Sequence, residues 1–448
     1  MKLINFYAEN VHGYMNFDIT FNNDVSFLVG SNGSGKTTAI KIIKAMLTPT
    51  PEFFSQIKFD SCLLQFERRN KIQVLRVESR GSNIAFQYNE LEAIVSKEKL
   101  EKIHDELIEN GRPTYQSISH SIFDRIRKLP TPIFLGVNRK RSLYDGPIDS
   151  RQNLWAREAF MSGNSLRRRK LEDSPLFDAL TDTQLMIQEA FKGIRNQERK
   201  QLNDLRDNIL KSSFKFVVFD PEIISDRKDL PSKASMLMRK KTEILRVLHK
   251  ISDVDSSITE EVNVFFSKLD TLLRELKESN DDHRLNLNWL MNQALIGRIS
   301  DLVDVIDTYD KMIAEIYEPL NQFLDTINLF FNDSGKSLQL DSVGRLFLQV
   351  GDFSKKVELD SLSSGERQIL VIVAQVLFNK YGSGLSSKRS IIIIDEPELS
   401  LHMRWQEMFS EIILQVSPQT QFVLATHSPD IVGDLSNKCK QIREVDSK

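Results

Sequence analysis

The sequence predicts an α/β fold: a mixed sheet accompanied by an antiparallel meander and interrupted by a helical insertion. Three observations predict it. Residues 25–47, VSFLVGSNGSGKTTAIKIIKAML, have the pattern of a strand, a glycine loop and a helix. Residues 61–89 alternate between apolar and polar side chains in three stretches, which is typical of antiparallel strands. Residues 389–402, RSIIIIDEPELSLH, place four isoleucines directly before two acids.

The isoleucine run at 391–394 predicts an interior strand of a parallel sheet. The run is β-branched and too short for a buried helix, and strands of this kind are covered on both faces. Ligands of open α/β sheets gather beyond the carboxyl ends of the strands, where Asp395 and Glu396 follow. Two acids in this place indicate a metal and a hydrolytic reaction. A phosphate-binding segment elsewhere in the chain would complete such a site.

Residues 30–37 supply that segment, because GSNGSGKT fits the P-loop pattern G-x-x-x-x-G-K-[ST] between a strand and a helix. The glycines let the backbone approach phosphates and turn its N–H groups inward at a helix N-terminus. Lys36 is expected to reach the β- and γ-phosphates of ATP, and Thr37 to ligate Mg²⁺. An ordinary glycine turn is the alternative. The predicted nucleotide-binding residues are Gly30, Ser31, Asn32, Gly33, Ser34, Gly35, Lys36, Thr37 and Thr38.

The amino-acid composition limits the class of protein but does not indicate a binding partner. The chain has 448 residues, 40% of them hydrophobic and 27% charged, and a formal net charge of −2. That charge argues neither for nor against nucleic acid as a partner. The two cysteines, Cys62 and Cys439, have no C-x-x-C partner, which fits a reducing cytosol. MKLINFYAEN lacks the pattern of a signal peptide and the apolar run 369–378 is short, so we expect a soluble, cytoplasmic protein without a membrane partner.

The pattern changes along the chain predict three regions. An N-terminal lobe is expected over 1–150, a helical insertion over 151–331 and a C-terminal lobe over 332–448. In the N-terminal lobe the first twenty residues read as two strands turned at His12-Gly13, before the P-loop segment and the meander. Residues 130–143, PTPIFLGVNRKRSL, read as a short apolar strand followed by a basic loop.

Helical spacing dominates the region from about 154 to 331. Core-facing helices of a bundle are favoured over a long coiled coil, because no heptad pattern persists. KFVVFDPEI at 215–223 could be a strand, and helix boundaries are expected at 279–283 and at Glu318-Pro319. The apolar stripe that indicates a bundle consists of Val262, Phe265, Phe266, Leu269, Leu272, Leu273 and Leu276.

Residues 362–366, Leu-Ser-Ser-Gly-Glu, precede an apolar helix and resemble the signature motif of ABC-type ATPases. The family's other parts occur in order along the chain. After the P-loop come this signature, the isoleucine strand with Asp395-Glu396, the turn at 398–402 and a last strand, QFVLATHSP, that carries His427. The resemblance implies an ABC-type P-loop ATPase head that hydrolyses ATP to ADP and phosphate.

The resemblance implies that each of these motifs has a role in phosphoryl transfer. Asp395 is expected to hold Mg²⁺ through water, Glu396 to orient and deprotonate the attacking water, and His427 to contact the γ-phosphate. A satisfied core histidine is the alternative for His427. In the family, the signature contacts the nucleotide held by another subunit, so two chains are expected to pair head to tail with ATP between them. The signature residues implied are Ser363, Ser364, Gly365 and Glu366.

The long segment between Lys36 and Ser363 resembles the branch that contains RecF, SMC-like repair ATPases and the ATPase domains of OLD-family nucleases. The chain departs from that branch in two ways. No glutamine occupies the expected Q-loop near residues 138–141, where Asn138 could substitute, with Gln65 as a second candidate. The chain also stops soon after His427, where OLD proteins continue into a Toprim nuclease domain.

A stand-alone ATPase of this kind resembles the ATPase subunits of anti-phage defence systems such as PARIS and Septu. The resemblance implies a sensor or scaffold that controls a separate effector protein, for which a Toprim nuclease is one candidate. A RecF- or SMC-like repair ATPase acting directly on DNA is the alternative, and a transporter subunit is a third. Residues 139–170 hold nine Lys or Arg against three acids. They could bind nucleic acid or an acidic partner, or form a solvated loop.

Overall fold

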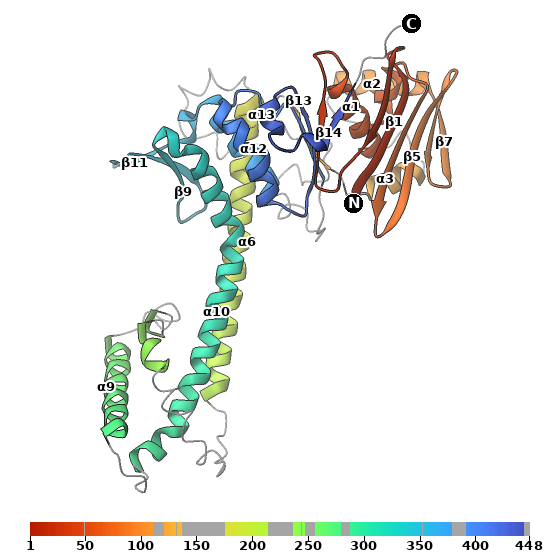
Figure 1. Cartoon of the computed structure of the whole chain (residues 1–448). Coiled ribbons are helices and arrows are strands. Elements are labelled where there is room, and N and C mark those ends of the chain that lie inside the picture. Colours follow the sequence, from red (N-terminus) through yellow and green to blue (C-terminus); the bar gives the residue numbers. More distant parts are fainter. Residues whose placement is uncertain are drawn as a thin grey trace. The chain divides into compact units, whose positions relative to one another are not determined.

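The computed structural model forms two compact units, which are described separately. It describes residues 1–48, 50–110, 121–130, 132–136, 175–213, 236–242, 244–246, 256–278, 287–351, 353–378 and 391–442. Met1–Phe191 and Gln322–Lys448 form the first unit, and Lys192–Asn321 form the second. Both predicted ATPase lobes thus belong to one unit, while the predicted lobe boundaries themselves stay predictions. Figure 1 colours the elements by their order in the sequence.

A five-stranded parallel sheet lies in the first unit. Its order is β14 (Cys439–Gln441), β3 (Val25–Val29), β13 (Gln421–Thr426), β12 (Ile391–Asp395) and β8 (Ile133–Leu135). The predicted isoleucine strand is confirmed as β12, which is interior and buried at every residue. Ile391 and Ile393 join the core that contains α1, and Ile392 and Ile394, also fully buried, alternate onto the opposite face. Side chains therefore cover the sheet on both faces, as the β-branched run predicts.

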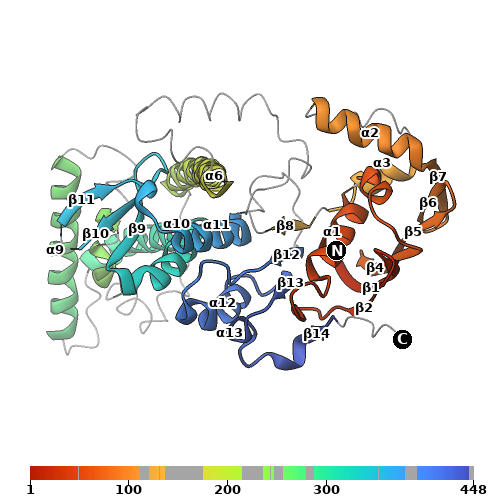
Figure 2. The same ribbon diagram turned by 90° about the horizontal axis from the view of Figure 1, so that it is seen from above.

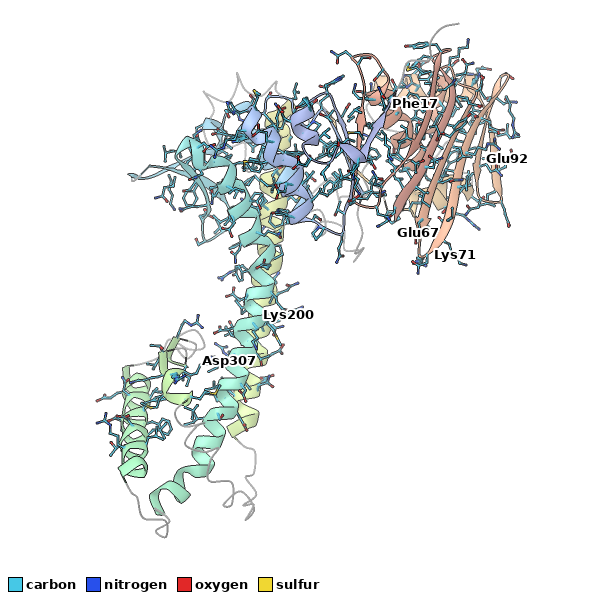
Figure 3. The ribbon with its side chains drawn as sticks, viewed as in Figure 1. Phe17, Glu67, Lys71, Glu92, Lys200 and Asp307 are labelled. Carbon is cyan, nitrogen blue, oxygen red and sulfur yellow. The ribbon has the colours of Figure 1, made fainter. Side chains whose placement is uncertain are left out.

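A six-stranded antiparallel sheet forms the other side of this core. Its order is β2 (Met15–Thr20), β1 (Lys2–Val11), β4 (Ser61–Arg68), β5 (Lys71–Arg80), β6 (Asn83–Tyr88) and β7 (Leu91–Ser96). The predicted N-terminal hairpin and three-stranded meander are confirmed. Figure 3 shows Glu67 and Lys71 at the β4–β5 hairpin, whose turn residues Arg69 and Asn70 both have positive φ. The sequence interpretation missed β7, whose Glu92 is also labelled.

Helices cover both faces of the parallel sheet. Helix α1 (Lys36–Leu47) packs between the two sheets, and α11 (Ser364–Phe378) and α12 (Met403–Val416) lie on the opposite side, as Figure 2 shows. This unit also contains α2 (Lys97–Asn110), α3 (Ser121–Arg127) and α13 (Pro429–Val432). A third, antiparallel sheet contains β9 (Lys336–Leu340), β10 (Leu346–Val350) and β11 (Phe353–Val357). Its β9 carries Lys336, which reaches the start of α11.

The second unit is helical. It contains the whole of α9 (Ser256–Glu278) and α10 (Leu287–Phe331) up to residue 321. The C-terminal part of α6 (Pro175–Ser213) also belongs to it. Its core joins residues from α6, from 236–246, from α9 and from α10, so the predicted bundle is confirmed in this part of the chain. Lys240 and Asp307, the latter labelled in Figure 3, form an ion pair at 2.9 Å. The core-facing α9 residues include Phe266, Leu269 and Leu273.

The expected helix boundary at Glu318-Pro319 is wrong. Pro319 lies inside α10, which continues to Phe331. A proline removes one backbone N–H and crowds the preceding turn, yet it does not have to end a helix whose flanking turns are packed. Leu320 and Phe323 are buried in the turn after it, and the Phe323 ring packs against Phe378. Tertiary packing overrides the local signal here.

Several predictions fall on residues outside the described part of the chain. These are the strand at 215–223, the boundary at 279–283, the basic segment 139–170 and Asn138, together with the side chains of Leu272 and Leu276. They stay predictions. Among the described residues, no helix is both long enough and apolar enough to cross a membrane.

Candidate nucleotide site

Three adjacent parallel strands end at the same edge of the sheet and deliver the predicted site residues together. Val29 pairs with Thr426 in the register of β3 and β13, and Ala425 pairs with Asp395 in that of β13 and β12. Three segments therefore leave the sheet side by side: the loop that begins at Gly30, the segment that begins at His427, here called the switch segment, and the turn that begins at Glu396. This is the edge at which α/β sheets bind ligands.

The glycine loop has the backbone geometry that its composition predicts. Gly35 has a φ of 96° and caps the N-terminus of α1, and Gly33 has a φ of 86°. A Cβ at Gly35 would lie 2.7 Å from Met15 Sδ and 2.9 Å from Phe17 Cζ, and the Phe17 side chain is labelled in Figure 3. Strand β2 thus packs beneath the loop and leaves no room for a larger residue. Ser31, Asn32 and Gly33 are exposed along the loop.

Lys36 lies inside the loop and is 5% exposed. Its Nζ donates hydrogen bonds to the carbonyl oxygens of Gly30 at 2.9 Å and Ser31 at 3.0 Å. Burial lowers the pKa of Lys36, and the nearby carboxylates of Asp395, Glu396 and Glu398 oppose that shift. The ammonium group is therefore held inside the glycine loop by backbone carbonyl oxygens, with three carboxylates near enough to favour its charge.

The predicted metal residues touch each other. Thr37 Oγ1 donates a hydrogen bond to Asp395 Oδ2 at 2.9 Å, across the first turn of α1 and the end of β12. A hydroxyl and a carboxylate are the hard oxygen donors that Mg²⁺ prefers. The donor set fits a magnesium ion bound beside a nucleotide, with Thr37 and Asp395 as its protein contacts.

Glu396 follows Asp395 in a left-handed backbone conformation with a φ of 50°. Its N–H donates to the carbonyl oxygen of Ala425 at 2.8 Å, which holds the residue against the end of β13. Such a conformation costs a non-glycine residue on the order of 1–3 kcal/mol and persists where the surrounding structure imposes it. The strand exit thus turns the Glu396 side chain out of the register that β12 would give it.

His427 stands directly after β13 and is exposed. Its Nδ1 lies 3.4 Å from Lys36 Nζ. For Lys36 Nζ to donate across this distance, Nδ1 must be the acceptor, and an imidazole in that tautomer carries its proton on Nε2. The Nε2–H group is then available as a donor to an anionic ligand. A satisfied core histidine, the alternative for this residue, does not describe an exposed side chain.

The signature residues form a reciprocal cap at the start of α11. Glu366 N–H donates to Ser363 Oγ at 3.3 Å, and Ser363 N–H donates to Glu366 Oε2 at 2.7 Å. Lys336 Nζ donates to both Glu366 carboxylate oxygens, at 2.8 and 2.9 Å. Burial alone would raise the pKa of Glu366, but Lys336 and the Ser363 N–H lower it on balance. The Glu366 carboxylate is thus committed to the protein, whereas Ser363 and Ser364 are exposed.

Gly365 is required by a close approach of the backbone. A Cβ there would lie 2.4 Å from the carbonyl oxygen of Ser400, in the turn after β12. Gln368 Nε2 also donates to the carbonyl oxygen of Pro397 at 3.0 Å. The signature end of α11 is therefore packed on the turn that follows Glu396.

The structure brings Lys36, Thr37, Asp395 and His427 into one connected group. Apart from backbone bonds within α11, the hydrogen bonds of Ser363 and Glu366 in the described part of the chain go to each other, to Lys336 and to Arg367. None of these goes to the P-loop of the same chain. Gln65, the second Q-loop candidate, lies within β4, paired with Asn5 and Val74.

Sequence reasoning missed two acid contacts of the site region. Glu398 accepts hydrogen bonds from the Thr426 hydroxyl and from the His427 N–H, and Lys336 pairs with Glu366. The acidic turn Glu-Pro-Glu offered a signal for Glu398, because a second acid stands two residues after Glu396. No local pattern pairs Lys336 with Glu366, since β9 and α11 meet only through the tertiary fold.

Comparison with known proteins identifies related sequences. The sequence profile of the family described as AAA ATPase domain matches residues 1–432. A retron Vc95 probable ATPase from Vibrio cholerae is 25% identical over 204 residues, which cover 42% of this chain and 40% of that protein. The Septu protein PtuA from Bacillus thuringiensis is 23% identical over 203 residues, 40% of this chain and 48% of that protein. The match therefore spans less than half the length of these relatives.

A further relative and two solved structures complete the comparison. A retron Ec83 probable ATPase from Escherichia coli is 23% identical over 153 residues, 30% of this chain and 28% of that protein. An Smc head domain with an extended coiled coil from Pyrococcus furiosus aligns over 99% of this chain and 94% of its own, with 12% identity and a TM-score of 0.39. The SMC head domain from Thermotoga maritima aligns over 97% and 93%, with 12% identity and a TM-score of 0.36.

Proposed function

Since this chain belongs to the AAA ATPase domain family, we propose that it binds ATP with Mg²⁺ at residues 30–38 and hydrolyses it to ADP and phosphate. The observation that carries the proposal is the convergence of Lys36, Thr37, Asp395 and His427 at the ends of β3, β12 and β13. Phosphoryl transfer needs little beyond such positioning and charge neutralisation.

Each residue is assigned a task that suits its place. The loop N–H groups and Lys36 bind the β- and γ-phosphates at the start of α1. Thr37 and Asp395 would hold Mg²⁺, which neutralises phosphate charge when bound. Glu396 orients the attacking water and takes its proton, because it lies next to the metal residue without being the hydroxyl's partner. His427 donates from Nε2 toward the γ-phosphate.

We further propose that two chains bind ATP between them, head to tail. Ser363 and Ser364 are exposed at the N-terminus of α11, and the positive end of a helix dipole attracts an anion. The hydrogen bonds of the signature do not reach the chain's own P-loop, so a nucleotide held by a second chain is the occupant that suits this surface. Leu399 and Met403, which are 38% and 64% exposed, lie close in sequence to Ser400, whose carbonyl oxygen packs on Gly365.

At the level of the cell, we propose that the chain is the sensor or scaffold subunit of an anti-phage defence complex and controls a separate toxic effector or nuclease. The support is its relation to two retron ATPases and to the Septu protein PtuA. The helical unit, residues 192–321, is the proposed handle for the effector, because an inserted bundle can transmit the closure of an ATPase head.

ATP turnover by the purified chain tests the enzymatic proposal. We expect Mg²⁺-dependent release of phosphate, lost in Lys36→Ala because the buried ammonium that faces the phosphates is removed. Lys41→Ala is the matched control, since Lys41 is exposed on the same helix. An equal rate in both variants, or no turnover by the wild type, would refute the assignment.

Co-expression with neighbouring genes tests the cellular proposal. We expect the chain to co-purify with a second protein whose toxicity is restrained or released according to the state of Lys36. ATP turnover that is stimulated by DNA, with no co-purifying protein and no toxicity, would favour the alternative of a repair ATPase that acts directly on DNA.

A further inference from the structure

We infer that Glu398 is a positioning residue that fixes His427, the donor to the γ-phosphate, at the end of β13. The inference rests on the proposed function, because it concerns the same nucleotide site. It assigns a task to the third acid of the Asp-Glu-Pro-Glu turn, whose first two acids are assigned to the metal and to the attacking water.

One carboxylate satisfies two successive residues of the switch segment. Glu398 Oε1 accepts the His427 N–H at 2.7 Å, and Oε2 accepts the Thr426 hydroxyl at 2.8 Å. Thr426 is fully buried, and its Oγ1 in turn accepts the Ser428 N–H at 3.0 Å. Hydrogen bonds to a carboxylate are shorter and stronger than neutral ones. The backbone on both sides of the His427 Cα is therefore held by Glu398, directly or through Thr426.

A second bridge keeps the two segments aligned. Ser428 Oγ donates to Gln406 Oε1 at 2.7 Å, and Gln406 Nε2 donates to the carbonyl oxygen of Leu401 at 2.8 Å. The turn itself is closed by Leu401 N–H on the Glu398 carbonyl oxygen at 3.0 Å. Glu398 thus stands on a turn that is anchored at both ends. Its carboxylate can fix His427 because its own backbone is fixed.

The position of the imidazole depends on this frame. His427 is exposed, and its ring lies 3.4 Å from Lys36 Nζ, which is a long hydrogen bond. The ring contact alone is therefore a weak restraint. A histidine whose backbone can shift will present Nε2 to the phosphate in a wrong place, and displacements of about 1 Å can cost on the order of 10²-fold in rate.

Turnover kinetics test the inference on the intact chain. Glu398→Gln keeps the shape of the side chain but offers only one good acceptor to two donors. We expect kcat to fall by about 10- to 100-fold, with KM changed far less, because the P-loop contacts remain. Glu407→Gln, the same change at an exposed position of α12, should leave kcat unaltered. A kcat for Glu398→Gln equal to that of Glu407→Gln would overturn the inference.

A double-mutant cycle separates positioning from an independent role. If Glu398 acts through His427, adding Glu398→Gln to His427→Ala lowers kcat no further than His427→Ala alone. Losses that multiply in the double variant would show that Glu398 acts by another route and would refute the inference.

Amide exchange supplies a readout that needs no turnover. In Glu398→Ala, exchange in a peptide that contains Ala425–Ser428 should accelerate without nucleotide, because His427 N–H loses its acceptor, while a peptide within β1 stays protected. Equal exchange of the switch peptide in wild type and variant would contradict the contact. If the proposed function is wrong, the wild type will hydrolyse no ATP. The exchange experiment still tests whether Glu398 binds the His427 N–H, because it needs no turnover.

Discussion

At the scale of single residues, Glu366 shows how the site region accommodates a buried charge. Glu366 is only 3% exposed. Its carboxylate accepts two hydrogen bonds from Lys336 and one from the Ser363 N–H, and these offset the cost of burying its charge. Breaking such a pair leaves an uncompensated charge, which costs more than the pair itself contributes. The stability of the N-terminus of α11 therefore depends on Lys336, which lies on β9 of the three-stranded antiparallel sheet.

Lys336→Met should destabilise the protein at neutral pH by about 2 kcal/mol, measured as the loss in free energy of unfolding. The pKa of Glu366 is lowered in the fold from its usual 4.5, so the stability it contributes is present above about pH 4.5 and is lost as the pH falls through the lowered value. The difference in free energy of unfolding between wild type and Lys336→Met should therefore become smaller at acidic pH.

A matched substitution decides whether the paired charge is the cause. Lys356→Met removes a lysine from the same small sheet, from β11, without touching Glu366. A pH-independent gap for Lys336→Met, or an equal loss in Lys356→Met, would contradict the account of this pair.

At the scale of elements, α11 illustrates a glycine kept for space rather than for conformation. Gly365 lies in the helix with no positive φ, and an alanine would ordinarily suit that position better by about 1 kcal/mol. The Ser400 carbonyl oxygen, 2.4 Å from the place of a Cβ, prevents it, because a backbone atom cannot rotate away as a side chain can.

Gly365→Ala should therefore lower the unfolding midpoint, by an amount equivalent to about 1–3 kcal/mol of overpacking. Gly297→Ala, inside α10, is the control, since nothing lies within 4 Å of its Cβ position. That substitution should raise stability slightly through helix propensity. Urea unfolding followed by circular dichroism measures both, and a stabilising Gly365→Ala would show that α11 does not pack on the turn as described.

The elements also show which parts of the fold can be predicted from sequence. β3, β12 and the P-loop helix were predicted because β-branched runs, glycines and helical spacing act locally. Strand β7 was missed because Leu91–Ser96 is short and merges with the helix that follows. Pro319 misled because packing within α10 outweighs one missing hydrogen bond.

The residues of the site likewise divide into those that the sequence predicts and those that depend on tertiary contacts. Lys36, Thr37, Asp395 and His427 could be assembled from sequence because parallel strands bring their carboxyl ends to one edge. The task of Glu398 and the partner of Glu366 depend on side-chain contacts between segments remote in sequence, which no periodicity encodes.

At the scale of the whole molecule, the proposal requires two chains, because one chain holds one P-loop and one signature. Mixing Lys36→Ala with Ser363→Arg chains confines both defects to one composite site of a mixed pair and leaves the other intact. Phosphate release by the mixture should exceed that of either variant alone.

The control for mixing places both substitutions in one chain and combines it with Lys36→Ala chains. No mixed pair then contains an intact P-loop, so no recovery is expected. Recovery that also occurs in this control, or is absent from the first mixture, would rule out the head-to-tail arrangement with independently active sites.

The central claim is that the exit of β12 places a water-activating carboxylate over a bound nucleotide, and Glu396→Gln tests it most directly. Phosphate release and ATP binding are measured on the same preparation, with Glu407→Gln as the matched control. The account predicts that Glu396→Gln binds ATP about as well as the wild type while turnover falls by about 10²- to 10⁴-fold. Turnover close to the wild-type rate in Glu396→Gln would contradict it.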